Sequence, residues 1–295
     1  MRVFVSGGAS HLARVLLPKL CADPAIEAVT AIDLKPVAFS HPRLTAHVCD
    51  IRDPAVAGLL PRHDALVHLA FVVLRGRMRP QRMFDVNVHG SMRLLRAARG
   101  AGVPRLVHLS SAAVYGSGVH VDEGAPLAPL PGFLYGEHKA LLETLIAAEL
   151  PDCVVLRPHA VLGPHAQPLL RALVRRPLYL KLPDPQPVLQ CVHEEDVADA
   201  VMLALARPVR GAFNLAVEEN FTARELVRSR HRLPVALPLP AARAAARTAW
   251  KLFGWGGEPE WVGGMARSLT LNCRRALVEL GWRRRHDLSA TLADA

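Results

Sequence analysis

Short apolar runs alternate with amphipathic segments over the first two thirds of the chain. The apolar runs predict strands at Arg2–Ser6, Val29–Asp33, Leu44–Cys49, Ala65–Leu69, Leu106–Ser110 and Val154–Arg157. The segments between them predict helices, the clearest at Leu12–Cys21, Met83–Ala101 and Tyr135–Glu149. Strands that are apolar throughout are typical of a sheet covered by helices on both faces. The alternation therefore predicts βαβ units and a parallel, doubly wound α/β sheet.

The pattern changes after Pro164. Residues 165–190 are rich in Pro and Arg and predict a loop-and-cap segment. Short predicted strands at 190–193 and 211–216 then flank a helix at Glu194–Ala206, and the tail from about Phe221 is mostly helical and basic. We therefore predict a Rossmann-like domain over residues 1–164, which 190–217 rejoin. The segments 165–189 and 218–295 are predicted to form a small, partly interleaved substrate-side cap.

Composition narrows the class of protein. The 295 residues are 51% hydrophobic, enough for one large domain or a domain with a small cap. The sequence has no apolar run long enough to span a membrane and no secretory signal at its start. Its 5 cysteines are scattered without a CxxC pair. That usage predicts buried thiols, no metal site and a cytoplasmic location.

The formal net charge of +10 raises the question of an acidic partner. The basic residues are scattered and no nucleic-acid-binding motif accompanies them, so we expect no nucleic-acid partner. One basic repeat stands out in the tail: Arg243, Arg247 and Lys251 recur every four residues, close to Trp250, Leu252, Phe253 and Trp255. Such a helix could lie weakly on an anionic membrane surface, or it could pack its aromatic residues inward within the cap.

A glycine-rich turn follows the first predicted strand. It reads Ser6-Gly7-Gly8-Ala9-Ser10-His11-Leu12-Ala13 and leads into a helix. Such a turn lets the backbone approach a pyrophosphate at the N-terminus of the helix. Ala13 in place of a glycine still allows close packing of helix on strand. Ser10 also replaces a glycine, so its side chain must point away or bond a phosphate.

Acidic residues end the next two predicted strands. Asp33 ends the second, where a carboxylate accepts hydrogen bonds from the ribose 2′-OH of NAD and repels the 2′-phosphate of NADP. Asp50 and Ile51 end the third, where an adenine could pack. The turn and these residues together predict NAD as the cofactor, in preference to NADP.

A candidate for hydride-transfer chemistry lies in the middle of the chain. Tyr135 and Lys139 begin a predicted helix four residues apart, which places them on one face, one turn apart. A tyrosine has a pKa of about 10, and a nearby cation lowers it, so that the phenolate can take a proton from an alcohol. Upstream, Ser110 and Ser111 end a strand at the carboxyl edge of the sheet, where such sheets bind ligands. Ser111 could donate a hydrogen bond to the substrate oxygen.

The order and spacing of these motifs resemble those of the extended short-chain dehydrogenases, the NAD-dependent epimerase/dehydratase family. Further matching motifs are His68-Leu69-Ala70, Asn87-Val88-His89-Gly90, Val114-Tyr115-Gly116, Leu156-Arg157-Pro158, Gly163-Pro164 and Val192-His193-Glu194-Glu195-Asp196. The resemblance implies an NAD-dependent enzyme in which Ser111, Tyr135 and Lys139 form the catalytic triad. It also implies that Asn87 supports the site, that Pro158 contacts the nicotinamide end, and that the helices at 83–101 and 135–149 pair in a homodimer. The predicted cofactor-binding residues are Gly7, Gly8, Ser10, His11, Leu12, Asp33, Asp50, Ile51, Leu69, Ala70, Asn87, Ser110, Tyr135, Lys139 and Pro158.

Two positions depart from the family's nucleotide-sugar enzymes. Ala160 stands where they usually have an asparagine, and Leu189 stands where they usually have an arginine that holds a diphosphate. The run from Ala70 to Leu74 is also apolar. These changes favour a lipophilic substrate, such as a sterol-type 3β-hydroxy or 3-keto compound. Two alternatives remain: a nucleotide-sugar epimerase or dehydratase, whose diphosphate would bind Arg171, Arg175, Arg176 and Lys181, and a non-enzymatic NAD(P)-sensing or scaffold protein.

Overall fold

A seven-stranded parallel sheet forms the centre of the computed structural model, which describes residues 1–74, 76–254 and 259–295. The strand order is β11-β7-β5-β4-β1-β2-β3. The bounds are β1 Arg2–Ser6, β2 Ala28–Asp33, β3 Leu44–Val48, β4 Ala65–His68, β5 Arg105–Leu109, β7 Val154–Pro158 and β11 Gly211–Leu215. The order reverses direction after β1, as it does in a doubly wound sheet, so the predicted fold class is confirmed.

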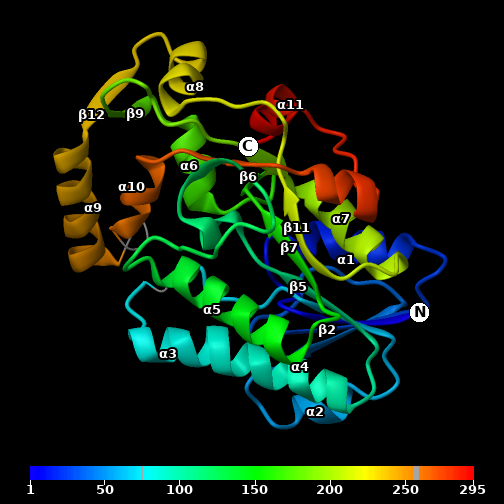
Figure 1. Ribbon diagram of the computed structural model, residues 1–295. Coiled ribbons are helices and arrows are strands. Elements are labelled where there is room, and N and C mark those ends of the chain that lie inside the picture. The colour runs from blue at the N-terminus through cyan, green and yellow to red at the C-terminus, as the bar shows by residue number, and fades with distance from the viewer. Residues whose placement is uncertain (75, 255–258) are drawn as a thin grey trace.

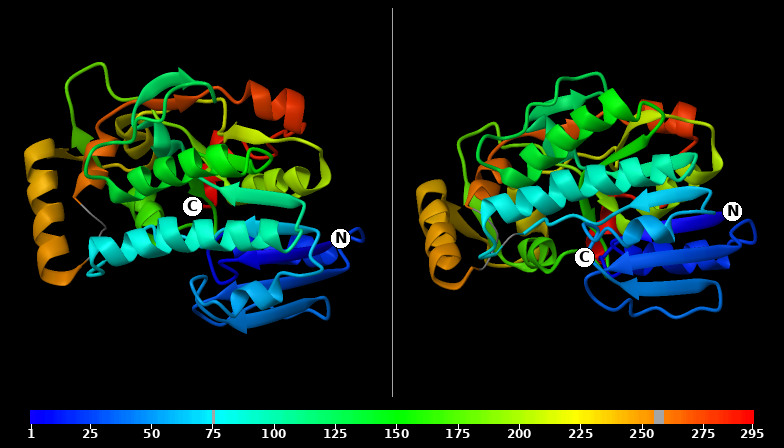
Figure 2. Two further views of the ribbon diagram at one scale, coloured as in Figure 1. Left: turned by 60° about the horizontal axis from the view of Figure 1, so that its bottom comes forward. Right: turned by 90° about the horizontal axis from the view of Figure 1, so that it is seen from below.

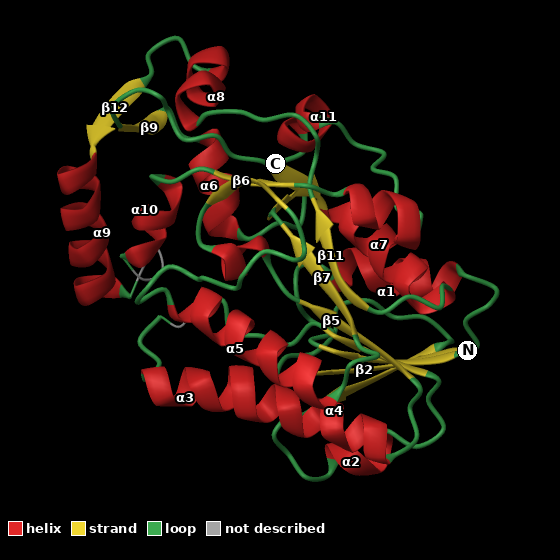
Figure 3. Ribbon diagram, viewed as in Figure 1, coloured by secondary structure: helices red, strands yellow, loops and turns green. Residues whose placement is uncertain are grey.

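Helices cover both faces of this sheet (Figures 1 and 3). On one face α1 (Ala13–Ala22) packs beside α7 (Glu194–Ala206), and on the other α4 (Ser91–Gly100) packs beside α5 (Leu134–Glu149), near the short α2 (Val56–Leu59). Each face has its own buried apolar cluster. The strands are therefore buried from both sides, which explains their continuous apolar runs.

The helix predicted at 83–101 has three parts in the structure. They are α3 (Pro80–Phe84), a π-helical segment η1 (Asp85–Gly90) and α4. Segments of π-helix are rare and are frequent at functional sites. Here the wide turn contains Asn87, whose side chain is fully buried against the loop that follows β4.

The loop-and-cap segment predicted at 165–190 contains regular structure. It forms α6 (Pro168–Arg175) and β9 (Leu178–Lys181). Leu170 and Val174 of α6 pack against an apolar cluster that includes Leu292 and Ala295. Contacts with residues more than a hundred positions away thus stabilise this helix, and local sequence patterns do not contain them.

The remaining elements lie around the carboxyl side of the sheet. Three parallel pairs of short strands join β8 (Ala160–Leu162) to β10 (Cys191–His193), β9 to β12 (Val235–Pro238), and β6 (Gly118–Val121) to β13 (Leu269–Leu271). The further helices are η2 (Ala112–Tyr115), α8 (Ala223–Arg230), α9 (Leu239–Phe253), α10 (Glu260–Met265), η3 (Ala276–Leu280) and α11 (Leu288–Ala293). Helix α9 forms one edge of the molecule in all three views (Figures 1 and 2). Trp255, named above with the basic repeat of the tail, lies outside the described residues. Within the described ranges, no helix is both long enough and apolar enough to cross a membrane.

Candidate active site

The glycine turn between β1 and α1 has the geometry of a phosphate-binding loop. The amides of Gly7 and Gly8 both donate to the Ile32 carbonyl, at 2.8 and 3.0 Å. Gly7 has φ +82°, and a Cβ on it would lie 2.6 Å from the Ala70 nitrogen. Only glycine fits there. The turn therefore presents bare backbone at the N-terminus of α1, which fits the pyrophosphate of a dinucleotide.

Side chains around the turn show how it tolerates Ser10. The Ser10 hydroxyl accepts a hydrogen bond from the Ala13 amide at 3.3 Å, so it points toward the first turn of α1. Asp33 accepts from the Ala9 amide at 3.0 Å and so ties the end of β2 to the same turn. Leu12 is buried beneath it. Burial also lowers the pKa of His11, whose ring is hydrogen-bonded to the His165 backbone.

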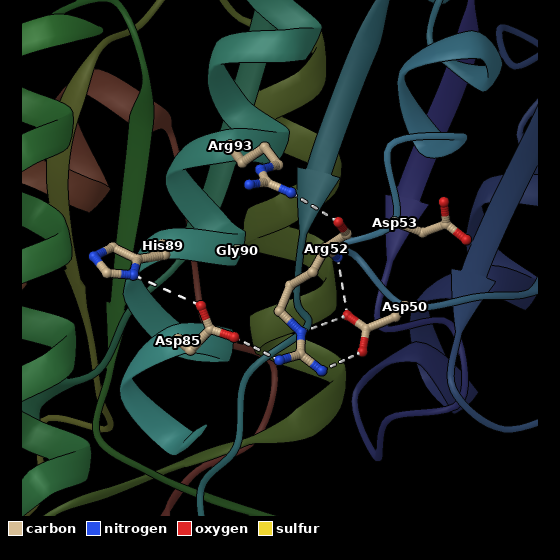
Figure 4. Close-up of a pocket in the computed structure, with 7 residues that line it drawn as sticks. All are labelled: Asp50, Arg52, Asp53, Asp85, His89, Gly90 and Arg93. Atoms are coloured by element: carbon tan, nitrogen blue, oxygen red, sulfur yellow. Dashed lines mark hydrogen bonds and ion pairs between the residues drawn. The ribbon is translucent and has the colours of Figure 1, made fainter. Parts of the chain in front are cut away.

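A shallow pocket of about 440 Å³ adjoins the end of β3, where the adenine is predicted (Figure 4). The Arg52 guanidinium holds the Asp50 carboxylate through two bonds of 3.0 and 2.7 Å and bonds Asp85 at 2.5 Å. These bonds keep the pKa of Asp50 below its usual value, so that the carboxylate stays an acceptor. Ile51 is buried beside it. The sequence motifs did not indicate Arg52 or Asp85, whose side chains meet across 33 residues of the sequence.

The Asn87 side chain holds the loop that follows β4 in place. The Asn87 amide oxygen accepts from the Val72 amide at 2.8 Å, and its nitrogen donates to the Val72 carbonyl at 2.9 Å. Leu69 is buried, and its own amide donates to the Ser6 carbonyl at 2.9 Å. Asn87 thus sets the path of the backbone from Ala70 to Val72, between the glycine turn and α5.

Ser111, Tyr135 and Lys139 come together at the carboxyl edge of the sheet. Ser111 caps η2, where its hydroxyl accepts from the Ala113 amide at 3.2 Å, and it also hydrogen-bonds Tyr135. Burial raises the pKa of the Tyr135 phenol, and the bond to Ser111 opposes that change. Lys139, only 3% exposed, donates to the Leu109 carbonyl. The predicted triad is therefore assembled in space, on η2 and on the first turns of α5.

Three aromatic rings surround Tyr135. Phe71 meets it edge to face with ring centroids 5.7 Å apart, and Phe133 lies at 5.6 Å. Trp261 of α10 stacks on it at 6.4 Å with an interplanar angle of 22°. The Lys139 ammonium lies 3.6 Å from the centroid of the Phe71 ring. The wall of the site is thus apolar, and its last member comes from a helix far along the chain that the motifs did not indicate.

A buried polar network lies behind Lys139. Glu143 lies one turn further along α5 and accepts a hydrogen bond from the Ser110 hydroxyl. It also accepts hydrogen bonds from Nε and Nη2 of Arg157, at 2.9 and 2.6 Å. Arg157 also donates to the Tyr115 hydroxyl at 2.6 Å. Glu143 and Arg157 are 4% and 6% exposed. The Ser110 hydroxyl therefore points to Glu143 in the core, and Pro158 ends β7 in a buried position.

Burial holds the pKa of Lys139 at about 7, against 10.5 for an ordinary lysine, and the nearby Glu143 carboxylate raises it only in part. At a pH between these two pKa values, the unfolded chain binds more protons than the folded chain. The free energy of unfolding therefore rises with pH in this range. From pH 7 to pH 9, in the absence of NAD, this group should add about 2 kcal/mol. Denaturant titrations at both pH values should show that gain in the wild type and lose it in Lys139→Met. An equal gain in the variant would contradict the assigned burial of the charge.

Comparison with known proteins identifies the family. The model of the NAD-dependent epimerase/dehydratase family matches residues 3–216. The chain belongs to this family. The resemblance seen in the motifs is therefore confirmed, and the protein is an NAD-dependent enzyme of the extended short-chain dehydrogenase type.

Relatives in this family differ in their substrates. The UDP-glucose 4-epimerase of Azospirillum brasilense is 30% identical, over 97% of this chain and 88% of its own length. A 4-hydroxy-2-methyl-3-oxo-4-farnesyl-3,4-dihydroquinoline-1-oxide ketoreductase of Stigmatella aurantiaca is 28% identical, over 96% of this chain and 92% of its own. A 3β-hydroxysteroid dehydrogenase/Δ5→4-isomerase of Mycobacterium tuberculosis is 31% identical, over 58% of this chain and 50% of its own.

Among solved structures, the dTDP-glucose 4,6-dehydratase DesIV of Streptomyces venezuelae, determined with NAD bound, superimposes with a TM-score of 0.75. It is 25% identical, and the alignment covers 99% of this chain and 95% of that one. The family and the fold are thus shared over nearly the whole chain.

Proposed function

We propose that this family member transfers a hydride between NAD and a secondary alcohol or ketone on a lipophilic, sterol-type substrate. The observation that carries the proposal is the aromatic wall that Phe71, Phe133 and Trp261 build around Tyr135. Flat apolar surfaces bury an alicyclic ring system favourably and offer few partners to sugar hydroxyls. Two relatives are named for lipophilic substrates, one a farnesyl-dihydroquinoline oxide and the other a 3β-hydroxysteroid.

The roles of the triad follow from its geometry. Bound NAD supplies the hydride acceptor, and its reduced form the hydride donor. Tyr135 takes the proton of the substrate hydroxyl in the oxidation and returns it in the reduction. Ser111, within hydrogen-bond reach of the Tyr135 phenol, donates to the substrate oxygen. Lys139, when charged, stabilises the phenolate.

The residues that would hold NAD line one edge of the sheet. Gly7, Gly8 and Leu12 would present backbone to the pyrophosphate, while Asp33 would accept hydrogen bonds from the ribose. Asp50 and Ile51 would lie against the adenine. The loop of Leu69 and Ala70, supported by Asn87, would border the nicotinamide half together with Pro158. The segments 165–189 and 218–295 would form the substrate-side cap, which carries Trp261 to the site.

Two of the positions considered for a diphosphate are occupied by other contacts. Leu189 forms a backbone bridge with Phe221. Arg175 donates to the Ala295 carbonyl at 2.7 Å. These contacts support the lipophilic substrate, because Leu189 carries no charge and Nε of Arg175 already donates within the protein.

A nucleotide sugar is the second candidate, and one observation favours it. On α6 the buried Arg171 Nε has no hydrogen-bond partner within the described residues, and the same holds for the Gln167 amide oxygen one turn earlier. A buried guanidinium nitrogen without a partner suits a diphosphate oxygen. The UDP-glucose 4-epimerase relative adds weight to this candidate.

A substrate panel separates the candidates. We expect purified protein to bind NAD more tightly than NADP, and to reduce NAD with sterol-type secondary alcohols but not with UDP-sugars. Arg171→Met should then leave turnover near the wild-type value, as should the control Arg274→Met, which removes an exposed arginine outside the cap segment 165–189. Turnover of a UDP-sugar only, lost in Arg171→Met and kept in Arg274→Met, would instead establish the second candidate. NAD binding with no turnover of either class would favour the sensing or scaffold alternative.

We further propose a homodimer in the cytoplasm. A groove of about 630 Å³ between α3 and α5 contains Phe84, Leu134 and Leu141, and Leu141 is 40% exposed. A second copy that pairs the same helices would bury this face. Light scattering should give a dimer mass for the wild type and a monomer mass for Leu141→Glu. A monomeric wild type would refute the dimer.

A further inference from the structure

Three polar side chains form a row across the central sheet. Ser6, His68 and His108 lie side by side in register on β1, β4 and β5, and all three are 0% exposed. Phe4 and Leu66, two residues earlier on their strands, belong to the apolar cluster beneath α4 and α5. Because side chains two apart on a strand share a face, the row interrupts that apolar face of the sheet.

The two histidines of this row are poorly satisfied. Nδ1 of His68 lies 2.6 Å from the Ser6 hydroxyl, and the two imidazole rings stack with centroids 5.3 Å apart. Within the described residues, Nε2 of His68 and both ring nitrogens of His108 have no hydrogen-bond partner. The same holds for the hydroxyl of Ser91, which is 0% exposed on the helix that covers this face.

Such burial is costly unless a partner is supplied. A neutral imidazole has one donor and one acceptor nitrogen, and a buried polar group without a hydrogen bond loses its hydration free energy. Several unpartnered polar atoms in one place are the setting in which proteins hold internal water. The row therefore has the chemistry of a small internal hydration site.

This row lies close to the ammonium group of Lys139. The lysine donates to the carbonyl of Leu109, the residue that follows His108. Burial, and after it the positive charge of Lys139, lowers the pKa of both imidazoles, that of His68 to about 3. Both rings are therefore neutral at ordinary pH, and each keeps a nitrogen lone pair that can accept a hydrogen bond.

The ammonium group of Lys139 needs such acceptors. It has three N–H donors, and within the described residues the Leu109 carbonyl is its one hydrogen-bond acceptor. On its own helix, Tyr135 bonds to a serine and the Glu143 carboxylate is held by Arg157 of β7. These neighbouring titratable groups thus leave the ammonium incompletely solvated, and the neutral imidazoles of β4 and β5 are the polar groups that remain.

We propose that His68 and His108 hold internal water beneath Lys139, and that this water solvates the ammonium group of the lysine. The two histidines are positioning residues, because they act through Lys139 and touch neither substrate nor cofactor. Ser6 orients the His68 ring through Nδ1. The effect on turnover rests on the triad of the proposed function, whereas the effect on the charge of Lys139 does not.

The charge of Lys139 can be followed directly, because the chain has only 5 lysines. In NAD-free protein labelled with ε-¹³C lysine, NMR resolves their signals, and the signal that Lys139→Met removes belongs to Lys139. We expect it to titrate with a midpoint of about pH 7 in the wild type. His108→Leu, which keeps the volume and removes the polarity, should lower the midpoint by about one pH unit. The loss of a hydrogen-bonded partner disfavours the charged form by about that amount.

The variant His108→Gln separates polarity from packing and from titration of the ring. Its amide keeps a donor and an acceptor but binds no proton in this range, so the midpoint should stay close to the wild-type value. His68→Leu should act as His108→Leu does. The matched control His63→Leu removes an imidazole that packs on Phe4 and bonds Thr30, and it should leave the midpoint unchanged. Circular dichroism checks the fold of each variant.

An unchanged midpoint in both leucine variants would overturn the proposal. An equal fall in His108→Gln would also overturn it, because the ring would then act by packing or by its own titration. A high-resolution crystal structure should show ordered water within hydrogen-bond distance of both rings, and a direct bond from either ring to Lys139 in its place would contradict the water.

Turnover provides a separate readout. In His108→Leu, kcat at pH 7 should fall about fivefold, since the charged fraction of Lys139 drops from about one half to about one tenth. A lowered midpoint without a fall in kcat would count against the triad of the proposed function and would leave the hydration of Lys139 standing.

Discussion

Tyr135→Phe should lower kcat for the hydride transfer by about 10³-fold, with little change in NAD affinity. General acid–base catalysis contributes about 10²–10⁴ to a rate, and the phenol is the group placed to exchange the substrate proton. Its hydroxyl is hydrogen-bonded to Ser111, and the lysine one turn further along α5 is buried with it. Phenylalanine keeps the ring and its packing against Phe71 and Trp261, so the variant removes the chemistry and leaves the wall intact.

Steady-state kinetics and NAD titration on the same preparation measure both quantities. The matched control is Tyr179→Phe, which removes the same hydroxyl from a buried tyrosine on β9 and should keep kcat. Turnover of Tyr135→Phe within a fewfold of the wild type would show that another group moves the proton. A loss of NAD binding as large as the loss of kcat would show that Tyr135 acts through the cofactor site.

Glu143→Ala should lower the free energy of unfolding by about 3–5 kcal/mol, because it leaves the Arg157 charge buried without its partner. The carboxylate accepts three hydrogen bonds from Arg157 and one from Ser110, and both members of the ion pair are nearly inaccessible to water. The lost carboxylate also compensated the buried Lys139.

Denaturant unfolding of a paired series isolates the cause. Glu143→Leu/Arg157→Met removes both charges together and should recover most of the stability, since an apolar pair can replace a buried ion pair at little cost. The exposed pair Arg96–Glu149 gives the comparison, and Glu149→Ala should cost far less. A Glu143→Ala variant as stable as the wild type, or a double variant less stable than the single one, would refute the role assigned to the pair.

The strand and helix order of the cofactor half could be predicted from the sequence. The strands β1 to β5 and β7 begin and end within about two residues of their predicted limits, because burial within the sheet makes them apolar runs, whereas β6 was not predicted. The neighbourhood of Tyr135 and Lys139 was predictable for a similar reason, since a four-residue spacing on a helix fixes their separation. The glycine turn was equally visible, since the backbone conformation at Gly7 requires glycine.

The sequence by itself determined the elements of short range: the parallel sheet, the glycine turn, the tyrosine and lysine on one face of a helix, and through their order the family. Only the tertiary structure decided what surrounds them. It placed Trp261 on Tyr135, linked Arg52 to Asp85, directed Ser110 toward Glu143 and folded α6 against the C-terminal segment. Each of these contacts joins side chains far apart in the chain, and whether they meet depends on how whole elements pack. Local periodicity reflects the conformation of one segment, whereas a substrate wall or a buried charge network depends on several segments at once.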